Sequence, residues 1–245
     1  MNYLKTINIL FLIFIIFICI TSVSSASAEY TNDIDIKMES INLTISEEYT
    51  KNNALGVRKR IDVNNDSYIN KSEIESFKDY YLKSQKKEYI KYVKIDNGKI
   101  SLEINSINME FENAQGKVSN DTLNVSSNII FIINQGLSDG RHKIWLQGHP
   151  SISTMKVKLP ENVEALSIDG LKNLEKSSIN NRIFIKGKST TQRNNLGDTT
   201  SFEYATTLEI YKKPFYERTF FITSLFTVLL ILIALASYMI KNNKK

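Results

Sequence analysis

A twelve-residue stretch from Asp62 to Glu73 repeats oxygen-bearing residues at a regular spacing. Its first, third, fifth, seventh, ninth and last positions are Asp62, Asn64, Asp66, Tyr68, Asn70 and Glu73. Calcium is a hard cation that takes about six to eight oxygen ligands, and a loop with this spacing can wrap its oxygens around one ion. Tyr68 would contribute its backbone carbonyl, and Asn70 would bind directly or through water. The three carboxylates offset the two charges of the ion, so the stretch predicts a Ca²⁺ site.

The sixth position of the loop is Ser67, where the calcium-loop pattern has glycine. The chain turns sharply there, and a non-glycine residue at positive φ is disfavoured by roughly 1 kcal/mol. We therefore expect a weakened site, of the kind that still fills outside cells, where modules work with dissociation constants of about 0.1–1 mM. The alternative is an Asp/Asn-rich turn that binds no metal. Asparagine is abundant throughout this chain, so such a stretch can arise by chance.

Apolar residues at helical spacing flank the loop on both sides. They are Ala54, Val57 and Ile61 before it, and Ile74, Phe77, Tyr81, Tyr89 and Tyr92 after it. Helix, twelve-residue loop and helix together resemble a single EF-hand over about residues 50–83, and the loop is similar to those of dockerin-type repeats. The apolar Ile69 at position eight suits the short strand of such loops. The resemblance implies a Ca²⁺ cofactor, and the sequence has no second loop of this pattern.

The sequence carries no nucleophile elbow, phosphate-binding glycine loop, thiol site or zinc motif. His142 and His149 lie seven residues apart and would face opposite sides of one extended strand, so we expect surface or turn roles for them. Trp145 is expected in the core or on a sheet face. The chain is therefore interpreted as a non-enzyme. An extracytoplasmic, glycosidase-like hydrolase with a structural calcium remains the alternative, because its two acids need no sequence motif.

Both ends of the chain are strongly apolar. Residues 1–28 contain Lys5, an apolar run from Ile7 to Ile20 and a closing Ala26-Ser27-Ala28, which together predict a cleaved signal peptide; an uncleaved anchor is the alternative. The only cysteine, Cys19, lies in this segment. The mature protein then has no disulfide, and its own core, helped by any bound metal, must hold it together.

Residues 220–240 are free of charge and long enough for a transmembrane helix. The lysine-rich tail 241–245 favours the cytoplasmic side, which gives a single-pass membrane protein with its ectodomain outside the cell. Four of the 31 basic residues lie in the two ends. The remaining 27 nearly balance the 26 acidic residues, so nothing favours a nucleic-acid partner.

The part between these ends is predicted to be α+β. Residues 46–93 have a helical pattern and form the EF-hand region, and residues 94–212 alternate as strands. Seven to nine strands are expected, among them segments around Ile100–Ile104, Leu123–Ile133 and Phe202–Ile210. Short strands at this spacing predict an antiparallel β-sandwich of immunoglobulin-like general design, with a barrel as the alternative.

Five Asn-x-Ser/Thr sequons occur, and two of them lie inside the calcium loop. The other three, at Asn42, Asn120 and Asn124, are candidate glycan acceptors. Taken whole, the chain resembles exported archaeal proteins that join a signal peptide, a lone EF-hand, a β-rich region and a C-terminal span. We expect a calcium-binding cell-surface protein that contacts the membrane and an envelope protein or glycan.

Overall fold

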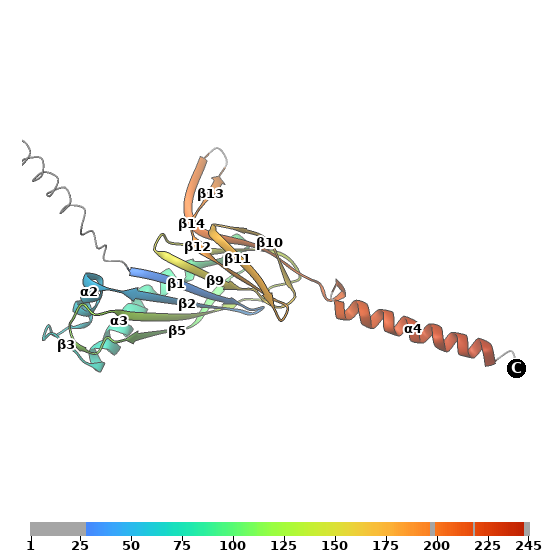
Figure 1. The fold of residues 1–245 in the computed structure, drawn as a ribbon, viewed down its shortest axis with the longest axis horizontal. Coiled ribbons are helices and arrows are strands. Elements are labelled where there is room, and N and C mark those ends of the chain that lie inside the picture. Colours follow the sequence, from blue (N-terminus) through green and yellow to red (C-terminus); the bar gives the residue numbers. More distant parts are fainter. Residues whose placement is uncertain (1–27, 197–198, 218, 243–245) are drawn as a thin grey trace, which may run out of the picture.

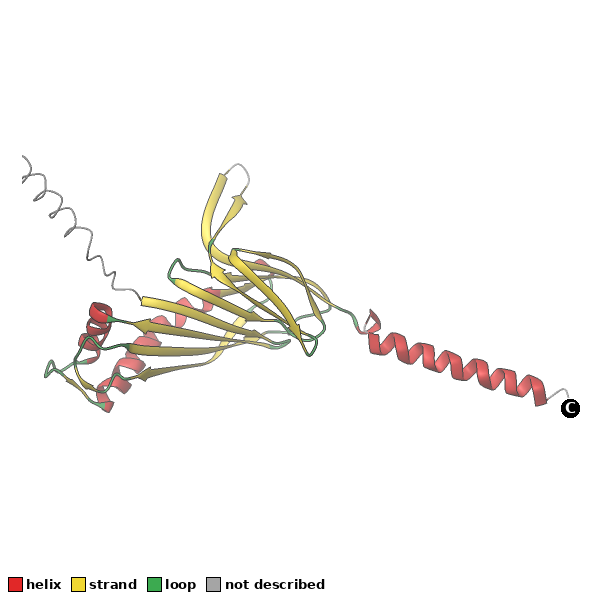
Figure 2. Cartoon of the chain, in the orientation of Figure 1, coloured by secondary structure: helices red, strands yellow, loops and turns green. Residues whose placement is uncertain are grey.

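The computed structural model describes residues 28–196, 199–217 and 219–242. The predicted signal peptide 1–28 lies outside these residues except for Ala28, and residues 243–245 of the predicted tail also lie outside them. The described part is mostly β-structure, with two helices at one end of the body and a third leaving the other end (Figures 1 and 2).

The larger sheet has seven strands in the order β11-β12-β9-β1-β2-β7-β5. Their bounds are β1 Ala28–Ile36, β2 Ser40–Tyr49, β5 Leu102–Glu112, β7 Leu123–Ile133, β9 Ile152–Lys158, β11 Leu171–Ile179 and β12 Arg182–Ser189. Strands β2 and β7 pair in register over ten residues, from Ser40 opposite Ile132 to Tyr49 opposite Leu123. Alternate residues of β7 are buried, as expected for a sheet that covers a core on one face.

The second sheet follows the order β10-β14-β8-β4, and β13 pairs with β14 beyond that path. Its strands are β4 Val93–Ile95, β8 Gly140–Gln147, β10 Val163–Asp169, β13 Thr191–Leu196 and β14 Thr199–Lys212. The inward faces of the two sheets share one core, in which Ile34, Phe131, Ile144 and Leu208 are at most 1% exposed. The two sheets therefore form a sandwich.

Helices α2 (Lys51–Ile61) and α3 (Lys71–Tyr89) cover one end of the larger sheet. Ala54, Val57 and Ile61 are buried against Leu123 and Val125 of β7, which confirms the predicted apolar face of the first helix. The short helix η1 (Ile90–Tyr92) follows α3 and leads into β4. The same face of β7 thus meets helices at its start and the second sheet farther along.

Three expectations about the body were wrong. The described part of residues 94–212 contains ten strands, where seven to nine were expected. Residues 28–49 form the hairpin β1–β2 in the middle of the larger sheet, so Ser46–Tyr49 are strand and the helical region begins only at Lys51. The sandwich is also not purely antiparallel, because β1 pairs with β9 in parallel. The segment that connects β1 to β9 contains the helices α2 and α3 and most of the other strands. Two parallel strands need a long connection of this kind, because a tight turn cannot join them.

Helix α4 (Thr219–Asn242) follows the short helix η3 (Phe215–Glu217) and projects from the end of the body opposite α2 and α3 (Figure 1). It contains the predicted span 220–240. Among the residues that the structure describes, no helix combines the length and the hydropathy needed to cross a bilayer. The membrane span stays a prediction.

Candidate metal centre

The loop between α2 and α3 contains all six predicted ligand residues. Asp62 is the C-cap of α2, and Asn70 is the N-cap of α3. The Asn70 side chain accepts a hydrogen bond from the Glu73 N–H at 3.1 Å, and the Glu73 carboxylate accepts one from the Asn70 N–H at 3.0 Å. This capping box begins α3 and fixes the last third of the loop.

Short-range hydrogen bonds turn the side chains of Asn64 and Asp66 toward the backbone of the loop. Asn64 Oδ1 accepts from the Asp66 N–H at 2.9 Å, and Asp66 Oδ1 accepts from the Tyr68 N–H at 2.8 Å. Asn and Asp commonly stabilise turns in this way. These hydrogen bonds keep the loop curved, and the side-chain oxygens of Asn64 and Asp66 face backbone N–H groups of the loop.

Asp62 is the most enclosed acid of the loop, at 6% exposure. Its Oδ2 accepts a hydrogen bond from the Ser67 N–H at 3.0 Å. Its Oδ1 is buried and meets no hydrogen-bond donor among the described residues. A buried carboxylate oxygen without a partner is costly, and a cation is one of the few groups that can compensate it.

Ser67 has φ +66°, the left-handed conformation expected for the sixth position of the loop. The next two residues form β3 (Tyr68–Ile69), which pairs antiparallel with β6 (Gly116–Lys117). Ile69 is fully buried. The connection between β5 and β7 therefore supplies the short partner strand for this loop.

The three carboxylates of the loop do not converge in this structure. Across the described residues, no group of three or more His, Cys, Asp and Glu side chains is arranged to hold a metal ion. Both oxygens of the Glu73 carboxylate have contacts within the loop: Oε2 accepts the N–H of Asn70 in the capping box, and Oε1 lies 3.5 Å from the backbone nitrogen of Asn64. An ion bound by Glu73 would compete with these contacts.

Arg58 is a structural residue that the sequence patterns did not reveal. It is 2% exposed, and its guanidinium donates to backbone carbonyls of the β5–β7 connection, including those of Asn113 at 2.6 Å and Thr122 at 3.3 Å. Burial lowers the pKa of Arg58, while nearby Asp121 acts in the opposite direction. The clamp ties α2 to the segment that carries β6, so it holds both sides of the loop together.

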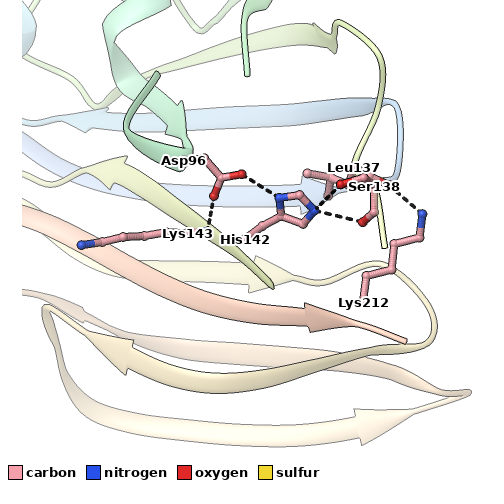
Figure 3. Close-up of polar contacts among 6 residues, drawn as sticks. All are labelled: Asp96, Leu137, Ser138, His142, Lys143 and Lys212. Atoms are coloured by element: carbon pink, nitrogen blue, oxygen red, sulfur yellow. Dashed lines mark hydrogen bonds and ion pairs between the residues drawn. The ribbon is translucent and has the colours of Figure 1, made fainter. Parts of the chain in front are cut away.

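His142 was expected at the surface, and that prediction was wrong because the ring is buried between two acceptors. Its Nδ1 lies 2.7 Å from Asp96 Oδ2, and its Nε2 lies 2.9 Å from the Ser138 carbonyl (Figure 3). Each ring nitrogen thus lies within hydrogen-bond distance of an oxygen, and these contacts hold the buried ring between Asp96 and Ser138.

Trp145 lies on β8, half-buried, and its indole N–H donates to Glu203 at 2.9 Å. The ammonium group of Lys94 sits 4.7 Å from the ring centroid. These contacts fit the expected sheet-face role. His149 is exposed, as expected for a surface or turn residue, and among the three candidate glycan acceptors Asn120 is exposed while Asn42 and Asn124 are half-buried.

No protein-family model matches the sequence, and no curated protein matches it. Among solved structures, AChBP from Bulinus truncatus, described in connection with nicotinic acetylcholine receptors, is 10% identical. The alignment covers 76% of this chain and 87% of that one, with a TM-score of 0.17. A TM-score this low carries no argument about the fold or the function of this chain.

Proposed function

We propose that this chain is a calcium-binding cell-surface protein in which Ca²⁺ acts as a structural clip. The ligands would be Asp62, Asn64, Asp66, the Tyr68 carbonyl, Asn70 and Glu73. One observation carries the proposal: the unpartnered Asp62 Oδ1, buried inside a loop whose other side chains also offer oxygens. Calcium would supply the positive charge that this oxygen lacks.

The position of the loop explains what such a clip would stabilise. It joins the end of α2 to the start of α3, and Ile69 reaches the core that these helices share with β5 and β7. Holding the loop closed therefore holds both helices on the sheet. Because the sequence has a single cysteine, no disulfide can form within one chain, and a bound ion would act as a local cross-link.

The test is the thermal unfolding of the full chain in a maltoside detergent, with millimolar calcium and with chelator. Calcium should raise the melting temperature, since a ligand that binds only the folded state stabilises it. Glu73→Gln should lose most of this gain, because it keeps an oxygen for the capping box but removes the carboxylate. The matched control is Glu75→Gln on the exposed face of α3. Equal melting temperatures with calcium and chelator would refute the clip.

We further propose that α4 anchors the protein in a membrane, with the β-body outside the cell. The helix has 24 residues, which at about 1.5 Å each exceeds the roughly 30 Å hydrocarbon core. Its large side chains at positions 228–233 are between 51% and 65% exposed, and they surround the helix with apolar surface. A helix apolar on all sides needs cover by lipid or protein. The uncharged run 220–240 extends beyond the described side chains, 221–236, at both ends.

The anchor is tested by expressing the chain in intact cells and treating them with protease. The β-body should be cleaved from outside, and the protein should remain with membranes after alkaline extraction. Protection of the body from external protease, or release by alkali, would contradict this arrangement. An exposed envelope protein or glycan is the expected partner of the body.

A further inference from the structure

A cavity of about 260 Å³ lies at the boundary between the part of the larger sheet that helices cover and the part that the second sheet covers. Its lining comes from β1 and β2 on one side, α3 and η1 on another, and the β8–β9 connection on the third. Cavities for drug-sized molecules are about 300–1,000 Å³, so this one suits a smaller ligand. It is separate from the calcium loop, which lies at the other end of α3.

Five tyrosines line this cavity, namely Tyr30, Tyr49, Tyr81, Tyr89 and Tyr92. The rings of Tyr30 and Tyr49 meet edge to face at 6.4 Å between centroids, and those of Tyr89 and Tyr92 do so at 5.4 Å. The first pair stands on the sheet and the second on the helical layer. Aromatic rings gathered from two sides are the arrangement with which proteins surround organic cations.

One carboxylate, Glu47, shares the cavity with these rings. It stands directly opposite Tyr30 in the β1–β2 pairing, and its Oε2 accepts a hydrogen bond from the Tyr49 hydroxyl. No Lys or Arg lines the cavity, and none forms an ion pair with Glu47 among the described residues. Burial raises the pKa of Glu47, with Tyr49 and the more distant Arg60 opposing that shift. Glu47 is thus a buried acid without a Lys or Arg beside it in the cavity, and a cationic ligand would favour its ionised form.

Asn32 provides a second unsatisfied group at the same place. It is 6% exposed and lines the cavity next to Tyr30 on the same face of β1. Its Oδ1 is buried and meets no hydrogen-bond donor within the described part of the chain. A ligand that brings both a positive charge and a donor would complement Glu47 and Asn32 together.

We propose that this cavity binds a small organic cation with an alkylated ammonium head, such as the trimethylammonium group of choline. The tyrosine rings would contact the methylated head, Glu47 would neutralise its charge, and a hydroxyl on the ligand would donate to Asn32 Oδ1. The same alkylated ammonium group occurs in free solutes and in phosphocholine lipids. The cavity residues would recognise this shared group in either source.

The test is calorimetric titration of the full chain in maltoside detergent with choline and with 3,3-dimethylbutan-1-ol, its uncharged isostere. Choline should bind and the isostere should bind at least tenfold more weakly, because only the charge differs. Equal binding of the two alcohols would overturn the proposal, and so would the absence of choline binding together with no preference for phosphatidylcholine vesicles. A parallel flotation assay compares phosphatidylcholine with phosphatidylglycerol vesicles, because α4 could enter either kind. A preference for phosphatidylcholine without choline binding would make lipid the source, and binding of choline alone would make it a solute.

Matched variants test the residues. Tyr30→Phe keeps the ring and should bind choline as the parent does, whereas Tyr30→Leu should weaken binding by about threefold to thirtyfold. Glu47→Gln preserves shape and should weaken choline while leaving the isostere unchanged. Melting temperatures of all variants establish that they are folded. Unchanged choline affinity in both Tyr30→Leu and Glu47→Gln would contradict the proposed mode of binding.

Discussion

The backbone N–H of Ser67 donates a hydrogen bond to Asp62 Oδ2 at 3.0 Å, which closes the candidate calcium loop from its first residue to its sixth. This contact needs the left-handed backbone of Ser67. It leaves Asp62 Oδ1 as the oxygen of that carboxylate without a donor among the described residues. The turn at Ser67 therefore organises the loop and leaves one buried oxygen of Asp62 that a cation could contact.

Ser67→Gly should stabilise the loop, because glycine adopts positive φ without the steric cost of a Cβ. The expected gain is roughly 1 kcal/mol in unfolding free energy, with a several-fold tighter apparent calcium affinity. Urea unfolding and calcium titration of the full chain measure the two effects. Ser72→Gly, in the first turn of α3, is the matched control and should destabilise by about 1 kcal/mol. Loss of stability in Ser67→Gly would show that the serine side chain is needed at this turn.

Arg58→Leu should destabilise the chain by roughly 2–4 kcal/mol, because it leaves several buried carbonyls without a donor. It should also weaken calcium binding, since the clamp holds β6 beside the loop. Lys59→Leu, on the exposed side of the same helix, provides the control and should change unfolding by less than about 0.5 kcal/mol. A similar small effect for both variants would mean that water replaces the guanidinium.

Asp96→Asn should cost roughly 1–3 kcal/mol, because the buried His142 ring loses its anionic acceptor. The comparison is Asp139→Asn, which breaks the ion pair of the more exposed Asp139 with Lys212 at 3.2 Å and should cost at most about 1 kcal/mol. Chemical unfolding at neutral pH measures both. Equal penalties would show that the Asp96–His142 contact contributes no more than the Asp139–Lys212 ion pair.

Glu47→Gln should change how stability depends on pH. Burial raises the pKa of Glu47 above its ordinary 4.5, so the folded state holds that proton more tightly than the unfolded state. The parent should therefore lose stability as pH rises from about 4.5 through the raised pKa, and the variant should not show this loss. Unfolding free energies between about pH 4 and pH 8 measure the difference. Parallel curves for the parent and the variant would show that Glu47 is solvated.

The sequence predicted the local elements of the candidate site well, because loop geometry depends on neighbouring residues. The position of the turn at Ser67, the strand at Ile69 and the buried faces of Ala54 and Ile74 all follow from short spacings. The strand Leu123–Ile133 has the predicted bounds because its alternation is long and regular.

Features that depend on distant segments were missed. The hairpin of residues 28–49 lies centrally in the sheet only because β9, over a hundred residues later, pairs with β1. The Arg58 clamp and the His142–Asp96 pair join segments more than forty residues apart. The tyrosine cavity likewise combines β1, β2, α3 and η1. No spacing within a single segment carries such information.

The most direct measurement for the calcium site is a Tb³⁺ luminescence titration of the full chain, excited through tyrosine. Tyr68 stands inside the loop and is 53% exposed, so an ion bound there would lie beside its ring. We expect saturable emission that calcium displaces with a dissociation constant of about 0.1–1 mM, and that Asp62→Asn and Glu73→Gln both abolish. Emission that calcium cannot displace, or that survives both substitutions, would contradict calcium binding at this loop.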